Sequence, residues 1–179
     1  MKNVMISELA VGSKFTTDIG TFVVLEQLEG ATKVITKNLF KKNVVFDRNT
    51  PDYKVAVVRK LFDGEILEKF SEVFGEENII EHEADLTTVN MQKDYGEIVC
   101  KVRPLTFDEV RKYNDMLVNK NLPDWWWTCT PWSVPGRGWN YGLAVVSPSG
   151  YINGRNCRYD FGVRPFCILK SNIFVSVED

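Results

Sequence analysis

The residue types that most often carry nucleophilic or metal chemistry are sparse in this chain of 179 residues. It has one histidine, His82, and four cysteines at irregular spacing, Cys100, Cys129, Cys157 and Cys167. Zinc sites need several His or Cys ligands at short, regular spacing, and no Cys-x-x-Cys pair occurs. A Cys–His nucleophile pair would need His82 beside Cys129 or Cys157, which nothing in the pattern indicates. We therefore expect a non-enzyme with no catalytic residue, no metal and no cofactor.

Recognition chemistry is concentrated in a loop over residues 132–141. From Pro131 the segment reads Pro-Trp-Ser-Val-Pro-Gly-Arg-Gly-Trp-Asn-Tyr, which combines three aromatic rings and an arginine with glycine and proline. Exposed Trp, Tyr and Arg side chains on such loops are typical interface anchors. The turn expected at 153–156 would add a second arginine. The binding residues that we predict are Trp132, Arg137, Trp139, Asn140, Tyr141 and Arg155. The alternative is a compact loop packed by its own rings.

Three consecutive tryptophans occupy residues 125–127, just before this loop. Side chains alternate faces along a strand, so Trp125 and Trp127 share one face and Trp126 lies on the other. At least one of these faces must belong to the core. One interpretation has all three rings anchoring the junction of helix and sheet. The other leaves one ring in a binding groove, where Trp offers a large contact area and an N–H donor.

The first half of the chain predicts a meander followed by two helices. Patterns rich in β-branched and aromatic residues predict antiparallel strands over 14–17, 21–26 and 32–36. Residues 40–50 predict a loop with a short extended piece. Apolar residues at helical spacing predict two helices, separated at Asp63-Gly64. The first opens at Pro51-Asp52 and buries Val55, Val58, Leu61 and Phe62. The second buries Ile66, Leu67, Phe70, Val73 and Phe74 and ends at Gly75.

The second half predicts one more helix and then short strands. Extended segments are expected at 78–81, 85–88 and 98–102. Thr106 and Glu109 match the capping box, which starts a helix that runs to about Val118. Its inward residues would be Val110, Tyr113 and Leu117. Further strands are expected at 125–128, 142–146, 151–153 and 163–169, with a last strand or a frayed tail at 172–177. This order of elements predicts one α+β domain.

Segments across nearly the whole chain resemble one family. They are Trp125-Trp-Trp-Thr-Cys-Thr-Pro131, Ala144-Val-Val-Ser-Pro-Ser-Gly150 and Gly162-Val-Arg-Pro-Phe166, with earlier pieces at 21–25, 53–61, 85–87 and 105–109. They resemble domain of unknown function 6273, a family of gut-type Gram-positive bacteria and their phages. The C-terminal pattern is also similar to the formylglycine-generating-enzyme-like branch of the C-type lectin fold. The resemblance implies a single lectin-like domain over residues 1–179. Its twisted antiparallel sheet would carry two to three helices, and long loops would present a binding face.

The lectin resemblance does not extend to the calcium site of the lectins or to the cysteine pair of the formylglycine-generating enzymes. The calcium-site tripeptides Glu-Pro-Asn and Gln-Pro-Asp are absent, and Tyr141 follows Asn140 where the lectin pattern has Asp. The formylglycine-generating enzymes use two neighbouring cysteines, and Cys157 has no second cysteine within a few residues. Arg164, in Gly-Val-Arg-Pro, is predicted to be a buried structural arginine, for which Asp124 or Asp160 would be natural partners.

Composition limits the partners and the location. The net charge is −2 and the isoelectric point about 5.6, which argues against nucleic acid as a partner because phosphate binding needs a basic surface. Neither a signal peptide nor a run of about 18 apolar residues is found, so we expect no membrane contact. The expected location is the cytoplasm of a bacterial host cell, or a phage particle. The four cysteines are then expected to be free, buried thiols.

The favoured function is a non-catalytic module that recognises a protein or glycan partner through the aromatic, Gly-rich loop. Such a module would suit a phage protein that contacts the host or blocks its defence. One alternative is a small-molecule-binding protein or enzyme, with a C-terminal pocket among Trp126, Arg164 and Tyr159. A second alternative is a structural virion subunit, in which the Trp loop would form the interface of a homo-oligomer.

Overall fold

The computed structural model describes residues 1–178, and Asp179, the last residue of the expected domain, lies outside the described part. The strands are β1 (Lys2–Met5), β2 (Lys14–Thr17), β3 (Gly20–Leu28), β4 (Ala31–Thr36), β5 (Lys41–Val45), β6 (His82–Asp85), β7 (Glu97–Cys100), β8 (Val102–Arg103), β9 (Trp126–Pro131), β10 (Gly142–Val146), β11 (Ile152–Asn156), β12 (Asp160–Val163), β13 (Phe166–Lys170) and β14 (Phe174–Val177). The helical segments are η1 (Ile6–Glu8), α1 (Val57–Leu61), η2 (Phe62–Ile66), α2 (Leu67–Phe74), η3 (Glu76–Asn78) and α3 (Phe107–Leu117).

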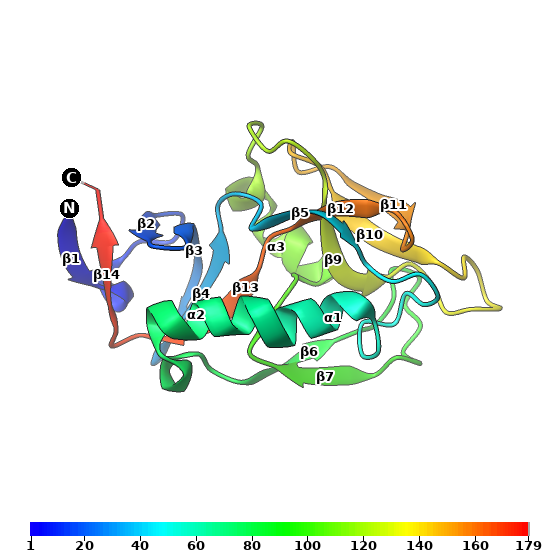
Figure 1. Ribbon diagram of the computed structural model, residues 1–179, viewed down its shortest axis with the longest axis horizontal. Coiled ribbons are helices and arrows are strands. Elements are labelled where there is room, and N and C mark those ends of the chain that lie inside the picture. Colours follow the sequence, from blue (N-terminus) through cyan, green and yellow to red (C-terminus); the bar gives the residue numbers. More distant parts are fainter. Residues whose placement is uncertain (179) are drawn as a thin grey trace.

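The strands form three sheets. The seven-stranded sheet has the order β1-β14-β2-β3-β4-β13-β8, the five-stranded sheet has the order β11-β10-β9-β12-β5, and β6 pairs with β7. Pairing is antiparallel except between β12 and β9, which run parallel. In Figure 1 the larger sheet occupies the left and centre, the five-stranded sheet lies at the right, and α1 to α2 run below both. The predicted mixed α and β class with mostly antiparallel sheets is confirmed.

The predicted N-terminal meander is confirmed as β2, β3 and β4, which are neighbours in the larger sheet. The segment at 172–177, left open between a strand and a frayed tail, contains a strand, β14, which pairs antiparallel with β1. The two ends of the described chain therefore lie side by side, at the left of Figure 1. This pairing gives the terminal strands backbone partners that neither end could find locally.

The first predicted helix begins later than expected. Residues 51–56 are not helical and contain a turn at 53–55, and Val55 is 66% exposed and not part of a buried face. The cause is Asp47, a buried side chain whose carboxylate accepts the backbone N–H groups of Asn49 and Thr50. The same carboxylate accepts the N–H of Val57 at 2.9 Å, so it caps α1 from outside the helix.

The two predicted helices are joined by a π-helical turn, η2, and not separated by a loop. Gly64 has φ −105° and ψ −105° within η2, so the kink falls at the predicted interruption. The buried face of α2 is formed by Phe70 and Phe74, and Gly75 ends it with φ +80°, as predicted. The capping box of α3 is also confirmed, because Thr106 and Glu109 each accept the other's backbone N–H.

Two predicted extended segments each divide into strands of different sheets, and one predicted turn is part of a strand. The segment predicted at 163–169 is two strands in different sheets, β12 and β13, with Arg164 and Pro165 between them. The segment predicted at 98–102 likewise divides into β7 and β8 at Lys101. The turn predicted at 153–156 lies within β11, which pairs with β10 along its whole length, and the actual turn precedes it at 147–151.

The core lies on both faces of β9, as alternation predicts. Trp127 belongs to the larger cluster, beneath α1 to α2, and its Nε1 donates to the carbonyl oxygen of Val44 at 2.7 Å. Trp126 belongs to a second cluster, which packs against the inward residues of α3. Trp125 is partly buried against the larger cluster, so the run mainly anchors the two layers of the fold. All four cysteines are buried, free thiols, as expected.

Candidate functional site

The ring of Trp139 lies on two glycines of neighbouring strands, β10 and β11. A Cβ atom on Gly142 would lie 2.4 Å from Cε3 of Trp139, and one on Gly154 would lie 2.8 Å from its Cζ3. The Trp132 side chain shares this floor, because the same two Cβ atoms would lie 2.9 Å from its Cβ and 3.0 Å from its Cε3. No other residue type leaves room for both rings. We call Trp132, Trp139 and this glycine floor the aromatic face.

Hydrogen bonds hold the loop in this shape. The Ser133 hydroxyl donates to the carbonyl oxygen of Trp139 at 2.9 Å, and the side-chain oxygen of Asn140 accepts the N–H of Gly136 at 2.8 Å. Gln92, from the loop before β7, accepts the N–H of Val134 at 2.7 Å. Asn140 is therefore an internal brace of the loop. The loop is packed by its own rings, yet Trp139 remains 38% exposed, so features of both alternatives coexist.

Arg137 extends from the same loop but is already paired. Its guanidinium makes an ion pair with Asp94, and both side chains are about half exposed. Its carbonyl oxygen also accepts a hydrogen bond from Gln92 at 3.2 Å. An exposed ion pair of this kind contributes little to stability. Arg137 therefore mainly ties the loop to the segment before β7, and Asp94 balances its charge.

Tyr141 and Arg155 lie on the opposite face of the β10–β11 pair from the aromatic face. Gly154 points toward the tryptophan rings, so Arg155 points away from them. Arg155 instead lies over the ring of Trp125, 5.2 Å from its centroid. Tyr141 packs against the larger core cluster beneath the guanidinium of Arg158, which is 4.1 Å from its ring centroid. The structure thus divides the predicted binding residues between two faces.

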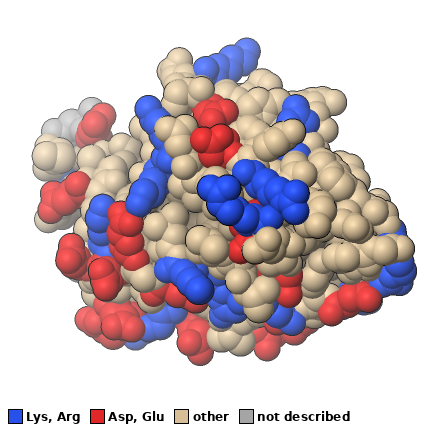
Figure 2. Space-filling model, turned by 45° about the vertical axis from the view of Figure 1, so that its right-hand side comes forward, with Lys and Arg blue, Asp and Glu red and all other residues tan. Residues whose placement is uncertain are grey.

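The second face contains residues that were not predicted. Trp125 meets Tyr151 edge to face at 6.3 Å, and Tyr151 is 65% exposed. Arg158 donates to the carbonyl oxygen of Arg48 at 2.7 Å. A strand over 151–155 places Tyr151 and Arg155 on one side, whereas the predicted turn at 153–156 does not indicate this. Figure 2 shows the end of the molecule that carries the loop, where Lys and Arg side chains gather beside a broad uncharged surface.

The sole histidine belongs to a buried charge cluster that the sequence did not predict. Nε of Arg103 donates to Nε2 of His82 at 3.0 Å, so this ring nitrogen carries no proton. Nδ1 of His82 lies 3.0 Å from the carbonyl oxygen of Ile80 and carries the proton. Both ring nitrogens are therefore engaged.

Burial raises the pKa of Cys129 to about 12 and that of Cys157 to about 11, so both thiols are protonated at neutral pH.

Acid should weaken the fold through His82. Burial, with the adjacent Arg103 charge, lowers the pKa of His82 below its ordinary 6.5. The unfolded chain therefore takes up a proton near pH 6.5 that the folded chain resists, and stability falls as the pH drops below 6.5. The expected slope is at most about 1.4 kcal/mol per pH unit. Urea denaturation between about pH 7 and 5.5 measures it. His82→Gln, which keeps an acceptor for Arg103, should flatten the curve, and an equal slope in both proteins would contradict the assignment.

No metal or membrane feature stands out in the part of the chain that the structure describes. Within residues 1–178, no group of three or more His, Cys, Asp or Glu residues is placed to hold a metal ion. None of the helices there has the length and apolarity needed to cross a membrane. Comparison of the chain with protein-family models, with curated proteins and with solved structures found no match.

Proposed function

We propose that the protein is a non-catalytic binding module that recognises a protein or glycan partner through the aromatic face. The observation that carries the proposal is the exposed ring of Trp139, which lies on a floor of two glycines. Tryptophan gives a large contact area with few rotatable bonds, and it is enriched among residues that dominate binding energy. A flat indole can cover an apolar protein side chain or the C–H face of a sugar ring.

Preorganisation supports the same proposal. Ser133, Asn140 and Gln92 each hold part of the loop by a hydrogen bond, so little of its conformational freedom remains to be lost on binding. The stability of the fold does not require this arrangement. The two glycines beneath Trp139 expose little apolar surface of their own, so covering them with an indole ring buries little additional apolar area. A rigid and partly exposed ring is better suited to a partner than to the core.

We also propose that the chain is a lectin-like member of the family called domain of unknown function 6273, encoded by a phage or by its Gram-positive host. Two of its motif segments, distant in sequence, meet in the five-stranded sheet, where Gly162 of β12 pairs with Trp126 of β9. In this proposal the Trp run and Gly-Val-Arg-Pro form the scaffold, and the loop between β9 and β10 carries recognition. Contact with the host, or blocking of its defence, would be its role.

Capture by the immobilised protein tests the proposed face. The baits are the wild type and Trp139→Ala, and the samples are an array of Gram-positive cell-wall glycans and a Gram-positive cell extract. We expect a partner retained by the wild type and lost with Trp139→Ala. Phe174→Ala removes an exposed aromatic ring from β14, in the other sheet, and should keep the partner. Equal retention by both variants, with unchanged melting temperatures, would refute the aromatic face.

A further inference from the structure

Two buried arginines of this protein are compensated in different ways. Arg103 is 3% exposed, and both of its terminal nitrogens donate to the carboxylate of Glu109, at 2.6 and 2.9 Å. Arg164 is 1% exposed, and it donates only to backbone carbonyl oxygens: from Nε to Thr36 at 3.0 Å and from Nη1 to Leu117 at 2.8 Å. The predicted partners Asp124 and Asp160 do not contact it, so the prediction was right about burial and wrong about pairing.

The guanidinium of Arg164 thus keeps unused hydrogen-bonding capacity. Among residues 1–178 its Nη2 has no acceptor, and no carboxylate forms an ion pair with it. The ring of Trp126 lies 4.9 Å from its Cζ and offers only a cation–π contact. Burial lowers the pKa of Arg164 to about 10, which still leaves it charged at neutral pH. A buried charge without a counter-charge is costly, so its retention calls for a reason.

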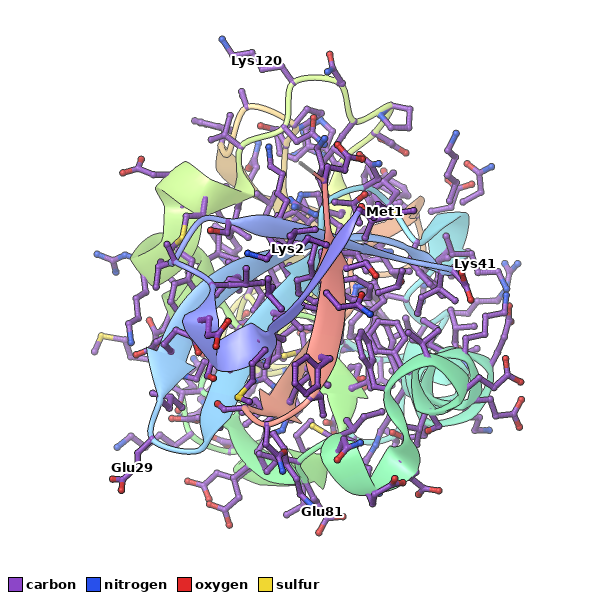
Figure 3. All side chains as sticks on the ribbon, turned by 90° about the vertical axis from the view of Figure 1, so that its left-hand side faces the viewer. Met1, Lys2, Glu29, Lys41, Glu81 and Lys120 are labelled. Atoms are coloured by element: carbon purple, nitrogen blue, oxygen red, sulfur yellow. The ribbon has the colours of Figure 1, made fainter. Side chains whose placement is uncertain are left out.

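A pocket of about 390 Å³ lies beside Arg164. It forms where the end of α3, the strands β2 and β3 and the chain after β4 meet. Its charged lining residues are all cationic: Arg164, Lys14, Lys37 and Lys120. No acidic residue among residues 1–178 lines it, although the chain as a whole has a net charge of −2. Lys120 stands at the rim, where Figure 3 shows it extending outward from the loop after α3.

The three lysines are available to a ligand. Within the described chain, none of them forms an ion pair with an acidic side chain. Lys14 belongs to β2, opposite Val23 of β3, and Lys37 directly follows β4. The rest of the lining is partly apolar, with Val23, Met116 and Val118. The pocket therefore combines a cationic end with an apolar wall, and its volume suits a small organic molecule.

We propose that this pocket binds a small phosphorylated organic molecule. The phosphate would take the unused donors of Arg164 and the ammonium groups of Lys14 and Lys37, and the organic part would lie against Met116 and Val118. Arginine provides planar, paired donors for phosphate oxygens, and lysine adds charge. The site is separate from the aromatic face and does not depend on the proposed function. It also differs from the pocket expected among Trp126, Arg164 and Tyr159, because neither aromatic residue lines it.

Calorimetric titration at constant ionic strength tests this site. The probes are inorganic phosphate, phenyl phosphate and, as an isosteric control, sulfate. We expect saturable one-to-one binding of phenyl phosphate, tighter than that of inorganic phosphate because of the apolar wall. The variant Lys14→Ala/Lys37→Ala removes two charge-assisted contacts from side chains that do not support the core, and it should weaken binding by about tenfold or more.

Matched variants separate this site from general charge effects. Lys42→Ala/Lys93→Ala removes the same charge from two exposed lysines outside the pocket, and it should bind phenyl phosphate like the wild type. Trp139→Ala should also leave binding unchanged, whatever its effect on partner capture. Absence of saturable binding, or equal loss in both lysine variants, would overturn the proposal. An oligonucleotide that binds the pocket more tightly than phenyl phosphate would overturn the small-molecule assignment.

Discussion

Replacing Glu109 by alanine is expected to lower the free energy of unfolding by about 3–5 kcal/mol, because it leaves the Arg103 guanidinium buried without its counter-charge. Burial alone would raise the pKa of Glu109, but the hydrogen bonds and charge of Arg103 hold it below its ordinary 4.5. The carboxylate also accepts the backbone N–H of Thr106 at 2.9 Å, so the start of α3 loses one of the two capping-box hydrogen bonds at the same time. Chemical denaturation followed by tryptophan fluorescence measures the loss.

Asp108 provides the matched control for this result. It is an exposed acid in the same first turn of α3, so Asp108→Ala removes the same charge from the same helix end without breaking a buried pair. Its expected cost is about 0.3–1 kcal/mol, the typical contribution of a charge to the helix dipole. Similar losses for Asp108→Ala and Glu109→Ala would mean that the buried pair with Arg103 is not what anchors α3.

A single methyl group on Gly142 is expected to weaken partner binding strongly. The added Cβ would lie 2.4 Å from Trp139 and 2.9 Å from Trp132, so the rings must leave the glycine floor. The backbone of Gly142 is not in the left-handed region, and alanine can adopt it without strain. We expect a stability cost of about 1–3 kcal/mol from overpacking. Partner affinity should fall by about 2 kcal/mol or more, roughly thirtyfold, as for loss of a dominant interface residue.

A double-mutant cycle shows whether Gly142 acts through Trp139. Binding is measured for Gly142→Ala, for Trp139→Ala and for the protein carrying both changes. If the methyl group acts by displacing the indole, Gly142→Ala has little further effect once Trp139 is absent. Additive losses would show that Gly142 supports binding by another route, and the glycine floor would lose its assigned role.

Features set by neighbouring residues were predictable from the sequence. The meander from β2 to β4 follows from strand patterns joined by short turns, and the capping box from Thr106 and Glu109 alone. The opposite faces of Trp126 and Trp127 follow from alternation along one strand. The loop at 132–141 could likewise be singled out, because its aromatic and glycine content is local. These features need no knowledge of which distant segments meet.

Features set by distant partners were not predictable. Val163 and Phe166 look like one strand until β12 and β13 find partners in different sheets. Asn153-Gly154 is a sequence typical of turns. In the structure, however, Gly154 lies within a strand, where its missing side chain leaves room for a tryptophan ring. The carbonyl partners of Arg164 come from β4 and from the end of α3, far along the chain. Every residue has a backbone carbonyl group, so the type of the partner residue does not indicate that its carbonyl oxygen accepts a hydrogen bond from a distant side chain.

The most direct test of the proposed aromatic face uses the five tryptophans as built-in reporters. Their indole N–H signals are recorded by NMR before and after addition of the captured partner, and each is assigned by single substitution. We expect the signals of Trp139 and Trp132 to shift or broaden, while those of the buried Trp126 and Trp127 keep their positions. Partner-induced change at Trp126 and Trp127, with Trp139 unaffected, would contradict it.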